Sequence, residues 1–252
     1  MNYLSGYHHY YLQTALLLLQ FLFVFQTFSQ TKNDAVDPSS LIDFASDIYG
    51  VSNKLVNGEV YFDNSELIAG HPFLDTPYWH VGTLHVSGTT FDSVLLKYDI
   101  QIDQVILKTR INDSTFTKVV LNKSLVDSFS VHNKFFAHSR HLPFDAETDR
   151  YCEVIHHEEM VALKTYKKEF IRKYTNSAPH GSFSSAITHK YTIINGQTHR
   201  TDRRRAFLRL FPDHRKSIRK FCRNHDINFR KANTNQLQKL FIYCEKLLTN
   251  QH

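Results

Sequence analysis

A series of short apolar runs from residue 58 to about residue 170 limits the folds open to this chain more than any other feature. The runs, such as GEVYFD, DQVILKTR and KFFAHS, are rich in Val, Leu, Phe and Tyr, and turn-forming pairs such as Ser87-Gly88 separate them. Successive turns lie about 8 to 12 residues apart, which leaves no room for crossover helices between parallel strands. The pattern predicts an antiparallel β meander, either a curved sheet or an open barrel, and excludes a parallel α/β core.

From Asp202 onward the apolar residues recur at helical spacing. They form three stripes, which predict three short helices: Ala206, Phe207, Leu210 and Phe211; Ile218, Phe221 and Cys222; and Leu237, Leu240, Phe241, Cys244, Leu247 and Leu248. Thr234 is the predicted N-cap of the last helix. The chain is therefore predicted to be α+β, with an antiparallel β domain over residues 58–175 and a hairpin plus basic helical subdomain over residues 176–252.

The amino terminus has the pattern of a secretory signal. The apolar run ALLLLQFLFVF covers only residues 15–25, whereas a membrane-spanning helix needs about 20 residues. Thr27 and Ser29 place small side chains at the −3 and −1 positions of a cleavage before Gln30. We expect a signal peptide over residues 1–29, a polar segment over residues 30–57, and an exported product that is periplasmic or associated with the cell envelope. Because residues 1–29 contain no Lys or Arg, an uncleaved membrane tether stays the alternative.

The stretch HHEE, residues 156–159, raises the question of a metal site. Neighbouring residues of a strand point to opposite faces, so only His156 with Glu158, or His157 with Glu159, share a face. The flanking runs YCEVI and MVALKTY are strand-like, and no HExxH motif is formed. We expect HHEE to be the polar turn of a β-hairpin, with a metal site at His156 and Glu158 as the alternative.

Charge is divided unevenly along the chain. Residues 30–163 contain 10 Lys and Arg against 19 Asp and Glu, whereas residues 164–252 contain 20 against 5. Arg215, Arg219 and Arg223 recur at four-residue spacing and form a basic ridge on the second predicted helix. The ridge has two interpretations: it binds an anionic partner such as lipid headgroups, or it is a solvated face that the acidic β domain balances. Because we expect an exported protein, we expect no nucleic acid as partner.

The sequence contains no motif of nucleophilic catalysis or nucleotide binding. G-x-S-x-G, G-x-G-x-x-G and P-loop patterns are missing. After HHEE, the next candidate site is His138 and His141 with Asp145, although single histidines are more often surface or half-buried residues. No catalytic residue and no cofactor is predicted, and the pattern leans away from an enzyme.

The three cysteines, Cys152, Cys222 and Cys244, are an odd set. In an oxidising compartment one pair can form a disulfide, and Cys222 with Cys244 is the candidate pair because both lie on apolar helical stripes. The alternative is three buried free thiols.

Taken together, these segments resemble an uncharacterised family of exported proteins of the Gram-negative envelope. The resemblance is carried by GHPFL, PYWHVGTLHVSGTTF, YCEVIHHEEMVALKTY and YTIINGQTHR, followed by the basic helical tail. It covers most of the predicted mature chain. In similar sequences a glycine-containing turn stands at the position of HHEE, in line with the predicted hairpin. The resemblance implies export, but it implies no activity and carries over no catalytic residue.

We therefore expect a non-enzymatic binding or structural protein of the cell envelope. The alternatives are a protein that binds anionic lipid at a membrane surface, and a hydrolase with a site that the sequence does not reveal. An envelope protein and an anionic lipid headgroup are the candidate partners. An apolar pocket inside the sheet would favour lipid binding, whereas a filled sheet would favour the structural role.

Overall fold

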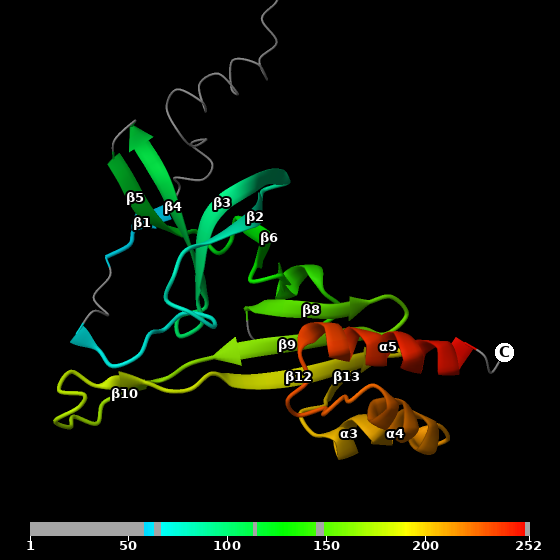
Figure 1. The fold of residues 1–252 in the computed structure, drawn as a ribbon. Coiled ribbons are helices and arrows are strands. Elements are labelled where there is room, and N and C mark those ends of the chain that lie inside the picture. Colours follow the sequence, from blue (N-terminus) through cyan, green and yellow to red (C-terminus); the bar gives the residue numbers. More distant parts are fainter. Residues whose placement is uncertain (1–57, 63–66, 113–114, 145–148, 250–252) are drawn as a thin grey trace, which may run out of the picture. The chain divides into compact units, whose positions relative to one another are not determined.

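The computed structural model describes residues 58–62, 67–112, 115–144 and 149–249. As predicted, the fold is α+β: antiparallel strands come first and three helices follow (Figure 1). The strands are β1 (Gly58–Val60), β2 (His80–Val86), β3 (Thr89–Asp99), β4 (Gln104–Asn112), β5 (Thr115–Leu121), β6 (Val126–Val131), β7 (Lys134–His138), β8 (Tyr151–His157), β9 (Val161–Lys167), β10 (Phe170–Ile171), β11 (Ser182–Phe183), β12 (Ile187–Ile194) and β13 (Gln197–Arg200). The helices are α3 (Arg204–Arg209), α4 (Arg215–Asn224) and α5 (Thr234–Thr249), and a short 3-10 turn, η2 (Ser139–His141), follows β7. The predicted signal peptide and polar segment lie outside the described residues.

Eleven of the strands form one sheet in the order β1-β5-β4-β3-β2-β6-β7-β8-β9-β12-β13, and β10 and β11 form a small sheet of their own. Four strand spacings separate β5 from β6 in this order, which is about 19 Å in a flat sheet. A single β-turn nevertheless joins them, because the Leu125 amide donates to the Asn122 carbonyl at 3.0 Å, and such a turn holds its end Cα atoms within about 7 Å. The sheet therefore curls strongly between β5 and β6. No ladder between described residues joins these two strands, so the sheet stays open.

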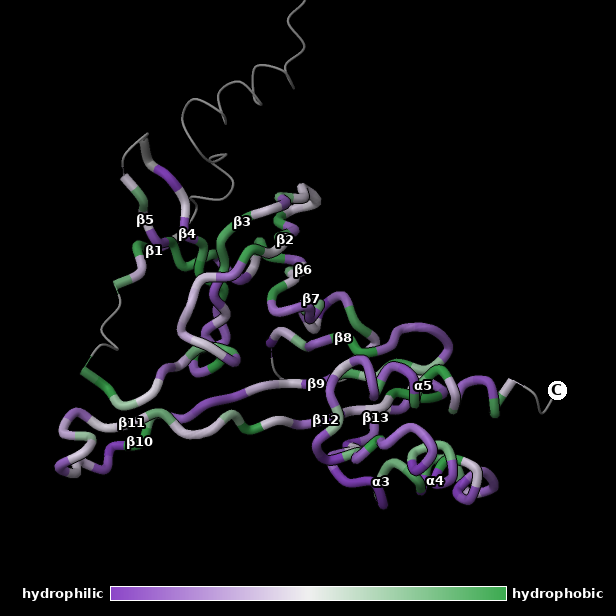
Figure 2. Tube along the Cα trace, viewed as in Figure 1, coloured by the Kyte–Doolittle hydropathy of each residue, from purple (hydrophilic) through white to green (hydrophobic). Residues whose placement is uncertain are grey.

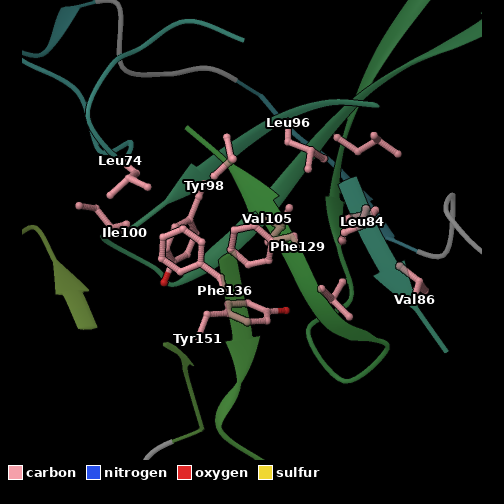
Figure 3. Close-up of a cluster of buried hydrophobic side chains, with 14 of the residues drawn as sticks. Leu74, Leu84, Val86, Leu96, Tyr98, Ile100, Val105, Phe129, Phe136 and Tyr151 are labelled. Carbon is pink, nitrogen blue, oxygen red and sulfur yellow. The ribbon is translucent and has the colours of Figure 1, made fainter. Parts of the chain in front are cut away.

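Aromatic side chains fill the inside of this curve (Figure 3). The ring centroid of Phe129 lies 4.9 Å from that of Phe136 and 5.1 Å from those of Tyr98 and Tyr151. All four side chains are buried. Aromatic pairs at such separations stabilise a core beyond the effect of burial alone. The curved part of the sheet is therefore filled by its own side chains.

The helices pack on one face of β8, β9 and β12. Ile155 of β8 and Ala162 of β9 share a second hydrophobic core with buried residues of the helices, among them Phe207, Phe241 and Cys244. Figure 2 shows the pattern behind this packing, because hydrophobic and hydrophilic segments alternate along α3, α4 and α5. The sheet itself continues past residue 175, since β12 pairs with β9 from Ile187 to Ile193.

All three predicted helices are present, but the prediction of Thr234 as N-cap of the last one is wrong by one residue. The Gln236 amide donates to Asn233 Oδ1 at 2.9 Å, and the Asn233 amide donates to Gln236 Oε1 at 3.1 Å. This reciprocal pair is a capping box with Asn233 as the N-cap. Thr234 has another role, because its hydroxyl donates to buried Glu153 of β8 and ties the start of α5 to the sheet.

The predicted hairpin at HHEE is present, but its turn begins two residues later than predicted. Strand β8 continues through His157 and β9 starts at Val161, which leaves residues 158–160 as the turn. The physical reason lies in His156, which is buried and hydrogen-bonds Glu245 of α5. A histidine that contacts the helix is held in the strand, whereas the two glutamates are free to turn.

Candidate functional site

The first predicted candidates, His156 and Glu158, do not face one another. His156 Nε2 lies 2.9 Å from Glu245 Oε2, and the other oxygen of Glu245 accepts from the Met160 amide at 3.1 Å. Glu158 is exposed in the turn. In the part of the chain that the structure describes, no group of three or more His, Cys, Asp or Glu is arranged to hold a metal ion. His156 thus fixes α5 to the sheet.

The second candidates, His138 and His141, face different carboxylates. His138 is buried, and its Nε2 lies 2.7 Å from Asp149 Oδ1. His141 Nε2 lies 3.1 Å from Asp127 Oδ1, which also accepts from Arg140. Asp145 lies outside the described residues. The two histidines therefore belong to separate polar contacts.

The basic ridge of Arg215, Arg219 and Arg223 lies on the exposed face of α4. Arg215 Nε donates to the Leu208 carbonyl at 3.2 Å, which holds the start of α4 against α3. No carboxylate among the described residues lies within 4.0 Å of these three guanidinium groups. The ridge is therefore not balanced by acidic residues that pair with it directly.

The carboxylates of the basic half are mostly engaged elsewhere. Residues 164–252 contain five of them. Glu169 pairs with Lys167, Asp202 with Arg200, and Glu245 with His156. Only Asp213 and Asp226 are left to offset the local charge. The C-terminal half thus presents a surface of strongly positive charge.

A row of three charged side chains, of which Glu153 and Lys190 are buried, crosses the sheet beneath the helices. Glu153 of β8 is opposite Lys164 of β9, and Lys164 is opposite Lys190 of β12. Glu153 is fully buried, accepts hydrogen bonds from the hydroxyls of Tyr166 and Thr234, and lies 3.9 Å from Lys164 Nζ. Burial lowers the pKa of Lys164, and Glu153 opposes this only in part. Glu153 and Lys164 therefore form a matched pair of opposite charges, which leaves Lys190 as the third member of the row.

Lys190, at the end of the row, has no such counterion. Its side chain is only 7% exposed, and its ammonium lies 5.3 Å from the ring centroid of Phe229. The nearest acid, Asp202, accepts from the Lys190 backbone amide at 2.7 Å, from Arg200 Nε at 2.6 Å and lies 3.2 Å from His189 Nδ1. Burial lowers the pKa of the Lys190 amine, and attraction to Asp202 opposes this only in part.

Lys190 lines a cleft of about 1060 Å³ between β12, the start of α3, the end of α4 and the loop that leads to α5. The residues that line the cleft also include four arginines, Arg203, Arg204, Arg223 and Arg230, and two aspartates, Asp202 and Asp226. Positive charge therefore prevails on its walls. Because Arg223 belongs to both the ridge and the cleft, the two form one continuous basic surface.

A second hollow, of about 890 Å³, lies beside β2 and β6. Its histidines, His80 and His132, have ring centroids 3.7 Å apart. Burial, followed by repulsion from His80, lowers the pKa of His132. Asp75 in the same hollow pairs with Lys134. This hollow lacks the excess charge of the first.

The cysteines are free and buried. Of the two alternatives for Cys222 and Cys244, the structure has the free thiols. Burial raises the pKa of Cys152 to about 12, so this thiol stays protonated at neutral pH and is a poor nucleophile.

Sequence reasoning located the ridge but missed the cleft. One signal was available in the strand ITHKYTII: Lys190 stands in the middle of a strand that otherwise consists mostly of apolar residues and Thr, at a position that is buried. That signal does not reveal which loops cover Lys190, because Arg203, Arg223 and Arg230 come from three later segments.

Comparisons with protein-family models, with curated proteins and with solved structures find no match to this chain. The resemblance to exported envelope proteins therefore stays a prediction. No helix in the described part of the chain has both the length and the apolar character needed to cross a membrane.

Proposed function

We propose that this chain is a non-enzymatic binding protein of the bacterial cell envelope that holds an anionic membrane surface against the basic face of α4. The observation that carries the proposal is the exposed ridge of Arg215, Arg219 and Arg223, none of which has a carboxylate of the described residues within 4.0 Å. Lysines add to the same helix at residues 216 and 220, and α4 contains no acidic residue. Clustered cations of this kind bind anionic headgroups, and each contributes about 1 kcal/mol near the surface.

The catalytic alternative receives no comparable support. The most buried carboxylate, Glu153, is closed off by Tyr166 and Thr234. The histidines of the two predicted candidates each face a separate carboxylate. General acid–base chemistry needs such groups within reach of a common substrate. A binding role therefore accounts for the geometry with fewer assumptions than a hydrolase does.

The proposal is tested by sedimentation of the purified chain with vesicles of phosphatidylcholine, with and without phosphatidylglycerol. We expect binding only to the anionic vesicles, and we expect added salt to weaken it because screening acts on exposed charges. Replacing Arg215, Arg219 and Arg223 together with Ala should weaken binding about a hundredfold, since three headgroup contacts of about 1 kcal/mol are lost.

A matched control removes three positive charges elsewhere, by replacing Arg110, Lys239 and Lys246 with Ala; these residues are exposed and lie outside the ridge and the cleft. Equal losses in both triple variants would show that net charge alone drives binding and would refute a role for α4. Duplex DNA that displaced the vesicles from the ridge at a lower concentration than a soluble anionic lipid would instead assign the surface to nucleic acid.

A further inference from the structure

We propose that the cleft beside α4 is a pocket for a phosphomonoester group, with the ammonium of the largely buried Lys190 as its anchor. The inference rests on the proposed binding of anions by the C-terminal half of the chain, and it names the chemical group that this surface selects. It concerns a different part of that surface, because only Arg223 is shared between the ridge and the cleft.

The charges beneath the helices are not fully balanced. A buried charge is tolerated when a partner of opposite sign and hydrogen bonds compensate for the lost water. Lys164 has such a partner in Glu153 at 3.9 Å. The Lys190 ammonium forms no hydrogen bond or ion pair with any described residue, although the Lys190 residue is only 7% exposed. Its charge is therefore left for a group that enters the cleft.

The nearest carboxylate cannot take this place. Asp202 Oδ1 accepts from the Lys190 backbone amide, and Asp202 Oδ2 is held by Arg200 and His189. Partial burial raises the pKa of Asp202, but these hydrogen bonds outweigh it and lower the pKa below its ordinary value. Asp202 thus stays ionised and already bound, so it fixes the backbone around Lys190 rather than neutralising its ammonium.

The arginines of the cleft indicate which kind of anion it binds. Arg203, Arg204, Arg223 and Arg230 line the same cleft as Lys190, and only two carboxylates oppose these five cations. Guanidinium groups match the oxygens of phosphate with paired hydrogen bonds. A phosphomonoester is close to a dianion at neutral pH and offers three terminal oxygens. A carboxylate or a phosphodiester carries a single negative charge and would leave more of the positive charge of the cleft uncompensated.

The size of the cleft agrees with a group larger than a free ion. Its volume of about 1060 Å³ lies slightly above the usual range of about 300 to 1000 Å³ for small-molecule sites. Two kinds of ligand carry a terminal phosphate on a small polar stem: soluble phosphomonoesters and the headgroup of phosphatidic acid. Separate titrations with each kind distinguish them.

The test uses the full chain and two variants, Lys190→Met and the control Lys239→Met, which changes an exposed lysine of α5 outside the cleft. Calorimetric titration with glycerol 3-phosphate measures the soluble source. Vesicles that contain phosphatidic acid or phosphatidylglycerol, matched in surface charge, measure the lipid source. The unchanged protein should bind glycerol 3-phosphate saturably, or should prefer phosphatidic acid over phosphatidylglycerol. Either preference should weaken at least about tenfold in Lys190→Met, because a charge-assisted hydrogen bond is lost, and should persist in Lys239→Met.

Two results would overturn the proposal: no preference for the monoester in either format, or a Lys190→Met variant that binds like the unchanged protein. Neither result bears on the ridge, whose binding to phosphatidylglycerol depends on α4. Conversely, the triple arginine variant should lose binding to phosphatidylglycerol. If it still binds glycerol 3-phosphate more tightly than Lys190→Met does, the pocket and its anchor are supported separately from the ridge.

Discussion

Replacing Lys190 with Met should make the protein more stable, although it removes a residue of the proposed pocket. Met has nearly the length of the lysine stem and stays apolar, so the burial of the stem is kept and only the charge is lost. The ammonium has weak compensation, namely the Phe229 ring at 5.3 Å and an Asp202 that is engaged elsewhere. Lys164→Met is the matched opposite case, because Lys164 lies 3.9 Å from buried Glu153.

The magnitude follows from three contributions. Desolvation of a buried ammonium costs several kcal/mol. The Phe229 ring returns about 0.5 to 1 kcal/mol, and the partly screened Asp202 returns a similar amount. We therefore expect Lys190→Met to raise the free energy of unfolding by about 1 to 2 kcal/mol, which corresponds to about 3 to 6 °C in Tm. Lys164→Met should lower it by about 3 kcal/mol, because it leaves Glu153 without a cation.

Chemical denaturation of the two variants and the unchanged protein, at neutral pH and at about pH 10, measures these effects. Folding lowers the pKa of Lys190, so the unfolded chain binds more protons than the folded chain between that lowered pKa and the ordinary value of about 10.4. The unchanged protein should therefore gain stability relative to Lys190→Met as pH rises through this window. A Lys190→Met variant that is less stable at neutral pH, or a difference that does not vary with pH, would refute the reasoning.

Three further substitutions test the packing that positions the site. Glu153→Ala should cost about 3 kcal/mol, because it removes the shared acceptor of two hydroxyls and leaves the partly buried Lys164 without its carboxylate, and urea unfolding measures the loss. Asn233→Ala should cost about 1 kcal/mol through loss of the N-cap of α5, whereas Asn235→Ala, two residues further on, should leave the thermal midpoint nearly unchanged. Gly82→Ala should prevent β2 from pairing with β6, because the new Cβ would lie 2.1 Å from the Ser130 carbonyl oxygen; a native-like circular dichroism spectrum would contradict this.

The β meander was predictable because its strands are short, apolar and separated by turn-formers. The order of the strands was not, since β2 lies between β3 and β6 although β6 follows β5 in the chain. Turn-formers mark where a strand ends, but they do not say how far the sheet curls. The curl depends on how the rings of Tyr98, Phe129 and Phe136 pack together, which is a property of the assembled core.

The candidate site likewise has a part that the sequence predicts, the ridge, and a part that it does not, the cleft. Helical spacing placed Arg215, Arg219 and Arg223 on one exposed face, because the period of a helix is local information. The cleft depends on contacts between β12 and segments that follow it, so periodicity cannot show it. The turn at HHEE and the N-cap of α5 were each misplaced by one or two residues because tertiary partners, Glu245 and Glu153, decided which residues end the elements.

The central claim, that the basic C-terminal half of the chain meets an anionic surface, is tested most directly by hydrogen exchange of the full chain with and without phosphatidylglycerol vesicles. We predict that the vesicles slow amide exchange in α4 and in the loop between α4 and α5, residues 215–233, and leave the β2–β6 part of the sheet unchanged. Protection confined to the sheet, or no change in α4 while the protein is vesicle-bound, would contradict the account.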